Sequence, residues 1–201
     1  MLSIAPWGRI ATNGANVSRI SLSTHHGTHV DVPYHVYHKG KPVDRMPLDR
    51  FFGPASLVDL APGGQLEPGD QITTSMLEPH RDLFAPGEIV ILRTGWERRY
   101  GSPQFFERFP VLSRESAKWI ANTRIKLLGM DTPSPDRDGR ECHPILLADG
   151  IEIIIVESLA NLNSLPARFT FVGLPLNLVG GDGSPIRAAA LVGEDVCNET
   201  G

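Results

Sequence analysis

Four residues with metal-binding side chains lie close together near the start of the chain. His25, His29, Asp31 and His35 fall within eleven consecutive positions. Neutral imidazole is a common ligand of zinc, copper, iron and nickel, and a carboxylate adds a harder oxygen that also suits manganese. Two histidines and one aspartate leave a coordination position open for water, as in catalytic metal sites. The cluster therefore predicts a divalent metal, zinc first and manganese as the alternative.

A metal in such a site predicts hydrolytic chemistry. Water on a metal ion loses a proton near neutral pH, and the metal-bound hydroxide attacks a carbonyl carbon. A further histidine that does not bind the metal can accept and donate protons, because its pKa lies near neutrality. Two other functions are compatible with the same residues. One is a metal-dependent lyase or cyclase acting on a small carbonyl compound, and the other is a metal-binding protein without activity.

The spacing of the cluster constrains the backbone that carries it. His29 and Asp31 are two residues apart, so on an extended strand both side chains face the same side, about 6.5–7 Å apart. The two outer histidines are too distant along a straight strand to join them, so the chain must bend on both sides. Gly27 and Pro33 lie where these bends are needed, since glycine admits unusual dihedrals and proline fixes its own.

The rest of the chain indicates a sheet-rich fold. The 201 residues include 20 glycines and 17 prolines between short apolar runs, a pattern typical of short strands joined by tight turns. Strands are predicted over residues 17–23, 55–60, 88–94, 126–130, 151–156, 169–174 and 186–192. A helix is predicted from an N-cap at Ser113 through Asn122, with a short one starting at Thr73 or Thr74. We therefore expect a single α/β domain over residues 1–201, with a mixed sheet flanked by a few helices.

The composition of the chain limits the kinds of molecule that it is expected to bind. The formal net charge is −4 and the lysines and arginines are scattered, so we expect a small-molecule substrate and no nucleic acid. No apolar run reaches the length of about 18 residues that a membrane helix needs, and the start does not read as a signal peptide. Two cysteines, Cys142 and Cys197, fit a reducing compartment without a disulfide between them. A cytoplasmic protein with no membrane partner is expected.

The stretch from His25 to His35 resembles the signature of the cyclase family of metal-dependent hydrolases, His-x-Gly-Thr-His-x-Asp-x-Pro-x-His, and matches it at every defined position. That family includes bacterial kynurenine formamidases and isatin hydrolases. Further stretches are similar to the family and follow in its order through most of the chain: 40–44, 47–48, 52–55, 129–134, 143–147, 157–162 and 183–187.

The resemblance implies a role for each matched residue. The implied metal ligands are His25, His29, Asp31, His143 and Glu157. Asp31 would be able to bridge two ions, and His35 matches the general acid/base. The resemblance further implies a swivelling β/β/α fold, a homodimer or homotetramer, and one or two zinc ions per subunit. The implied reaction is hydrolysis of a C–N bond in a small amide such as N-formylkynurenine, as in an arylformamidase, with an isatin-type lactam or a lactone as alternative substrate.

Three positions allow two interpretations each. Glu157 lies fourteen residues after His143, two more than in most family members, so Glu152 is the competing ligand, although the Ser-Leu-Ala-Asn-Leu that follows favours Glu157. The segment before the signature is shorter than usual, and family members carry a substrate-contacting Trp there. Trp7 is therefore either a substrate-binding residue or a core residue. Asp131 is either a turn residue or an acceptor for a ligand histidine.

Overall fold

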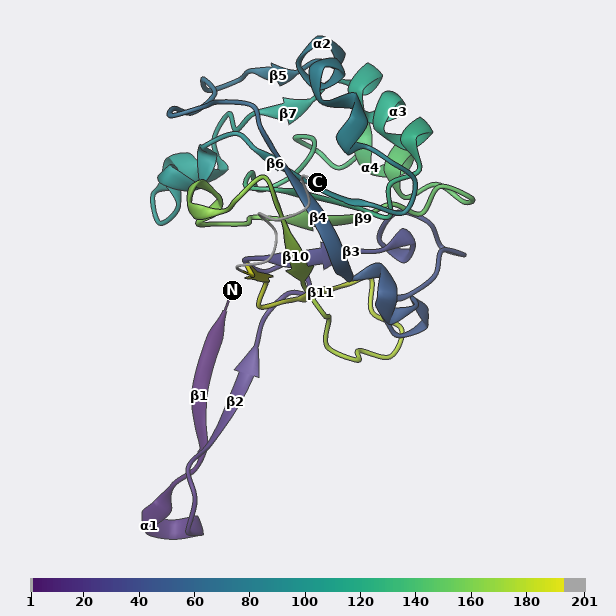
Figure 1. Cartoon of the computed structure of the whole chain (residues 1–201). Coiled ribbons are helices and arrows are strands. Elements are labelled where there is room, and N and C mark those ends of the chain that lie inside the picture. The colour runs from purple at the N-terminus through teal and green to yellow at the C-terminus, as the bar shows by residue number, and fades with distance from the viewer. Residues whose placement is uncertain (1, 194–201) are drawn as a thin grey trace.

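The computed structural model describes residues 2–193, which form an eight-stranded sheet, two small strand pairs and a few short helices (Figure 1). The strands are β1 (Ser3–Gly8), β2 (Val17–Ser21), β3 (His29–Asp31), β4 (Phe52–Asp59), β5 (Gln71–Ile72), β6 (Ile89–Arg93), β7 (Val111–Leu112), β8 (Leu127–Met130), β9 (Ile154–Glu157), β10 (Arg168–Val172), β11 (Gly183–Pro185) and β12 (Ala189–Leu191). The α-helices are α1 (Ile10–Asn13), α2 (Thr74–Leu77), α3 (Arg114–Thr123) and α4 (Cys142–Leu146).

The large sheet is mixed, as predicted. Its strand order is β11-β3-β9-β8-β6-β4-β10-β12. The four central strands β4, β6, β8 and β9 pair in parallel, and the outer strands on both sides pair antiparallel. The small pairs are an antiparallel β1–β2 hairpin and a parallel β5–β7 pair.

Strands β6, β8 and β9 are buried on both faces, which explains their nearly continuous apolar sequences. One core layer packs α2, α3 and α4 against the sheet, and the other fills the opposite face under residues 43–51 and 159–165. Helix α3 confirms the prediction for that segment. The Ser113 side chain accepts a hydrogen bond from the backbone N–H of Ser116 at 3.1 Å, which caps the first turn.

Strand β3 carries the centre of the histidine cluster and lies between β11 and β9. In the β3–β9 register, His29 lies opposite Glu157. Val30 pairs with Val156, and both belong to the core layer on the opposite face from α4. Side chains alternate along a strand, so those of His29 and Asp31 both face the side of the sheet that α4 covers. The predicted extended geometry for this pair is confirmed.

The bends predicted on both sides of β3 are also present. Gly27 has φ +66°, a conformation that other residues adopt at a cost. Pro33 begins the 3₁₀ helix η1 (Pro33–His35), and its fixed φ suits a first helical position. These two turns bring His25 and His35 back toward the strand between them. Their side chains come close enough to stack, with ring centroids 4.1 Å apart.

The β1–β2 hairpin extends away from the rest of the molecule (Figure 1). Residues 3–7 of β1 and all of β2 are exposed. The hairpin nevertheless carries several large apolar side chains, namely Ile4, Trp7, Ile10, Val17 and Ile20. An isolated two-stranded hairpin is marginally stable in water, so this element lacks the packing that usually supports such a structure.

Two expectations from the composition concern membrane helices and the cysteines. Among residues 2–193, no helix combines the length and the apolar character that crossing a bilayer requires. Cys142 has a free, buried thiol. Cys197 lies outside the described residues, so the structure does not test the expected absence of a disulfide.

Candidate metal centre

Asp31 contacts three histidines that come from different parts of the chain. Its Oδ1 lies 2.7 Å from His25 Nδ1 and 3.2 Å from His29 Nε2. Its Oδ2 lies 3.3 Å from Nε2 of His143, which is carried by α4. The aspartate is almost completely buried, and a buried carboxylate needs charged or hydrogen-bonded partners. The structure thus brings together four of the five residues predicted as metal ligands.

Glu157 is the fifth member of the cluster. Its Oε2 lies 3.3 Å from His29 Nε2, and its Oε1 lies 3.2 Å from His143 Nε2. Glu152, the competing residue, instead forms an ion pair of 2.8 Å with Lys41 at the surface. Glu152 stands in a turn before β9 in which the backbone N–H groups of Ile151 and Glu152 both donate to the carbonyl of Ala148.

His35 lies beside this cluster and not at its centre. Its ring centroid is 4.1 Å from that of His25 and 5.5 Å from that of His143. Its Nδ1 is 3.7 Å from Asp182 Oδ2. Burial lowers the pKa of His35, and the positive charges of His25 and His143 lower it further, with Asp31 opposing the shift. The side chain is therefore neutral near pH 7.

The charges of the cluster perturb one another strongly. Burial alone would lower the pKa of His29, but hydrogen bonds to Asp31 and Glu157 raise it to about 10. Burial likewise opposes the charge on His143, yet its carboxylate partners raise its pKa to about 12. The same contacts hold the pKa of Asp31 well below its usual range despite complete burial. The N–H groups of His29 and His143 can thus donate to these carboxylates.

The donor set fits a divalent cation. Three imidazoles and two carboxylates face one another in a mostly buried position, and His25, His29 and Asp31 each offer a ligand atom within 4.8 Å of the others. Nitrogen and carboxylate oxygen donors in such a mixture suit zinc and also manganese. A cation among these atoms would replace the protons of these N–H groups and neutralise the two buried carboxylates.

Each ligand histidine has a hydrogen-bond partner on its other ring nitrogen. His143 Nδ1 lies 2.9 Å from Asp136 Oδ1, and His25 Nε2 lies 3.0 Å from Asp182 Oδ2. His29 Nδ1 lies 2.8 Å from the carbonyl oxygen of Gly27. Such partners fix the ring orientation and the tautomer of metal-binding histidines. In each ring, one nitrogen therefore faces the carboxylates of the cluster and the other contacts an oxygen outside it.

The sequence had suggested a different aspartate for this supporting role. Asp131 is buried and accepts hydrogen bonds from the backbone N–H of Thr94 at 3.0 Å and from its hydroxyl at 2.6 Å. It therefore ties the end of β8 to the end of β6 and supports no ligand histidine. Asp136 and Asp182, which do, were not predicted. Asp136 stands in the polar, turn-rich stretch 131–141, and that composition was the signal available in the sequence.

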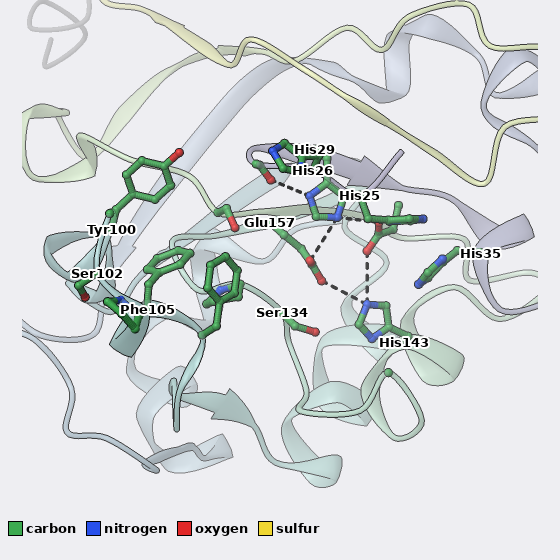
Figure 2. Close-up of a pocket in the computed structure, with 18 residues that line it drawn as sticks. His25, His26, His29, His35, Tyr100, Ser102, Phe105, Ser134, His143 and Glu157 are labelled. Carbon is green, nitrogen blue, oxygen red and sulfur yellow. Dashed lines mark hydrogen bonds and ion pairs between the residues drawn. The ribbon is translucent and has the colours of Figure 1, made fainter. Parts of the chain in front are cut away.

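A cavity of about 870 Å³ opens beside the cluster. Figure 2 shows His25, His35, His143 and Glu157 on one side of it and Tyr100, Ser102 and Phe105 on the other. This volume is within the range of about 300–1,000 Å³ that is usual for small-molecule sites. The cavity thus combines a charged, metal-compatible wall with an aromatic wall.

Trp7 lies outside both the core and the cavity of its own chain. It lies on the projecting hairpin, where its side chain is 65% exposed, so the core interpretation is wrong. It does not line the cavity of its own chain. Its ring instead stacks under the guanidinium of Arg19, with the guanidinium carbon 3.7 Å from the ring centroid.

Comparisons with known proteins identify the family of this chain. The family model described as Cyclase matches residues 3–137. The kynurenine formamidase of Salinibacter ruber (strain DSM 13855 / M31) is 34% identical over 182 residues, which cover 88% of this chain and 80% of the relative. The kynurenine formamidase of Geobacillus thermodenitrificans (strain NG80-2) is 31% identical over 186 residues, covering 91% of this chain and 83% of the relative.

Solved structures share the fold. Isatin hydrolase A from Labrenzia aggregata, bound to benzyl benzoate, superposes with a TM-score of 0.83 at 25% identity and covers 96% of this chain and 84% of its own. A structure described as a potential metal-dependent hydrolase with cyclase activity gives a TM-score of 0.76 at 28% identity, covering 93% of this chain and 85% of its own. The chain therefore belongs to the cyclase family of metal-dependent hydrolases.

Proposed function

We propose that the protein hydrolyses a small amide, and that a formamide of the N-formylkynurenine type is its substrate. The observation that carries this proposal is the convergence of three histidines and two carboxylates beside a cavity with an aromatic wall. The kynurenine formamidases among its relatives support the choice of a formamide.

The proposed metal ligands are His25, His29, Asp31, His143 and Glu157. This set would hold one or two divalent ions, with zinc preferred and manganese as the alternative. When bound, the metal supplies a nucleophilic water at neutral pH and polarises a carbonyl group. The protein contributes a fixed donor geometry, because each of the three rings is also held from its far side by an acceptor.

We assign proton transfer to His35. A neutral imidazole is required to accept a proton, and the lowered pKa of His35 provides that form near pH 7. Its Nδ1 faces Asp182 Oδ2 at 3.7 Å, so a proton on Nδ1 lies toward a carboxylate. Nε2 is then the nitrogen that takes a proton from the attacking water and returns it to the leaving amine.

The aromatic wall would hold the substrate's ring. Tyr100 and Phe105 pack edge to face, with centroids 5.4 Å apart, and Phe105 packs in the same way against Phe106 at 5.1 Å. Such edge-to-face arrangements are the favoured geometry for aromatic pairs and suit a third ring placed against them. The acyl group would then point toward the histidines on the opposite wall.

The alternative substrate is an isatin-type lactam or a lactone, which the fold shared with isatin hydrolase A favours. A lyase or cyclase acting on a small carbonyl compound is a different reaction class. Mass spectrometry of the product separates the two, because hydrolysis adds one water to the substrate and elimination does not.

The test measures metal content and turnover together. Purified protein is analysed for zinc and manganese and assayed with N-formylkynurenine, isatin and a simple lactone. His29→Ala should lose metal and activity, whereas the exposed His38→Ala should keep both. Metal with turnover of the formamide supports the proposal. If the protein binds metal but turns over only the lactam or the lactone, the substrate is of that class instead. If the protein binds no metal after reconstitution, the proposed metal centre is wrong.

We further propose that the protein is a homodimer or homotetramer in which the β1–β2 hairpin packs on a second copy. The hairpin projects from the rest of the described residues, and its large apolar side chains remain exposed there. Burying such surface in a neighbour would stabilise both. In this arrangement Trp7 would contact substrate only in the cavity of the second copy.

A further inference from the structure

We propose that Asp136 is a positioning residue that aims Nε2 of His143 at the metal. The inference rests on the metal centre proposed above. Asp136 is 4% exposed and stands in the loop between β8 and α4. It contacts no other member of the cluster in the described residues except His143.

The two carboxylate oxygens of Asp136 contact different groups. Oδ1 lies 2.9 Å from His143 Nδ1 and also accepts from the backbone N–H of Gly139 at 2.8 Å. Oδ2 accepts from the backbone N–H groups that begin α4, those of Glu141 at 3.0 Å, Cys142 at 2.5 Å and His143 at 3.4 Å. One side chain therefore fixes the loop, the start of the helix and the imidazole that the helix carries.

This contact decides which ring nitrogen faces the metal. An ionised carboxylate can only accept, so the nitrogen next to it must be Nδ1–H. A neutral imidazole with its proton on Nδ1 has its lone pair on Nε2. That nitrogen lies 3.3 Å from Asp31 Oδ2 and 3.2 Å from Glu157 Oε1. Asp136 thus selects the tautomer and the orientation in which His143 can act as a ligand.

An amide in place of the carboxylate separates the two roles. In Asp136→Asn, the amide oxygen can still accept from the backbone N–H groups that begin α4. The amide NH₂ group then faces His143 Nδ1 and requires that nitrogen to accept, which moves the proton to Nε2. The substitution is therefore expected to preserve the start of α4 and to lose the Gly139 hydrogen bond, while giving His143 the tautomer in which Nε2 cannot bind a metal.

The experiment titrates the metal-loaded protein with a chelator and measures the zinc that each variant retains. Asp136→Asn is compared with Asp138→Asn, a matched control in the same loop whose side chain is exposed and accepts only from the backbone N–H of Arg140, at 3.2 Å. We expect zinc affinity at the site containing His143 to fall roughly 10- to 100-fold in Asp136→Asn. Asp138→Asn should match the wild type.

A second comparison distinguishes positioning from support of the fold. If Asp136 acts through His143, then adding Asp136→Asn to His143→Ala should cause no further loss of zinc. Additive losses of zinc affinity would overturn the inference by assigning Asp136 a structural role, as would unfolding of Asp136→Asn in excess chelator at the assay temperature. Equal zinc affinity in Asp136→Asn and wild type would also overturn it. If the wild type binds no zinc, the failure belongs to the proposed function.

Discussion

Replacing Glu157 with Gln provides a direct test of how the metal centre is built, because the chain contains its own control. Glu157 is buried and its two oxygens contact Nε2 of His29 at 3.3 Å and Nε2 of His143 at 3.2 Å. Gln keeps the shape and the hydrogen-bonding oxygen but removes the negative charge. Glu152→Gln makes the same chemical change five positions earlier, at a residue whose carboxylate forms an ion pair with Lys41. The Lys41 side chain is 53% exposed.

The two substitutions are expected to change zinc affinity by clearly different amounts. Loss of a residue that merely orients a metal ligand lowers metal affinity about 10- to 100-fold. Glu157 contacts the ligand nitrogens of two histidines directly, so its loss should exceed that range, which corresponds to more than about 2.8 kcal/mol of binding free energy. The ion pair of Glu152 lies at the surface, where such pairs contribute about 0–1 kcal/mol to folding and nothing to metal binding.

The assay is competition for zinc between each variant and a chelator of known affinity, followed by elemental analysis of the protein fraction. Circular dichroism confirms that both variants keep the fold. The reasoning is refuted if Glu152→Gln loses zinc while Glu157→Gln retains it. It is also refuted if Glu157→Gln binds zinc within threefold of the wild type, since the carboxylate would then be a bystander.

Three further predictions follow from the same geometry. His35→Gln should lower kcat about 10²- to 10⁴-fold with zinc content unchanged, and loss of zinc would instead make His35 a ligand. In the metal-free protein the raised pKa values of His29, about 10, and His143, about 12, keep both rings protonated at pH 7. Metal binding should therefore release protons, and the affinity for the metal should rise from pH 6 to pH 9. Calorimetry in two buffers of different ionisation enthalpy checks this, because proton release makes the heat of binding depend on the buffer. Identical heats in the two buffers would contradict the prediction. Ile4→Ser with Ile20→Ser, a cross-strand pair on the hairpin, should shift the protein toward monomers in light scattering, and an unchanged mass would argue against hairpin-mediated assembly.

Spacing within a short segment could predict the part of the site that is local. His29 and Asp31 share a face because side chains alternate on a strand, and this holds whatever surrounds the strand. The bends at Gly27 and Pro33 follow from backbone preferences of those residues alone. The same applies to α3, whose Ser113 cap is set by the helix's own first turn.

Contacts between distant segments could not be predicted in this way. Asp136 meets His143 only because the loop after β8 folds back onto the start of α4. Asp182 reaches His25 because β11 pairs with β3, and β11 is too short and polar to be recognised as a strand. Trp7 was expected near substrate or in the core, and it is instead exposed on a hairpin that projects from the other described residues of its chain.

The pairing of β3 with β9 has a consequence for how the protein is made. β3 is the first strand of the large sheet to leave the ribosome, yet it joins that sheet between β9 and β11, which are synthesised near the end. Until β9 appears, the histidine motif has neither a neighbouring strand nor the carboxylate of Glu157. Closing so long a loop is slow, because its entropy is lost before the contacts form. The complete donor set therefore exists only after β9 has been made, and tight metal binding marks a late stage of folding and stabilises the folded state by mass action.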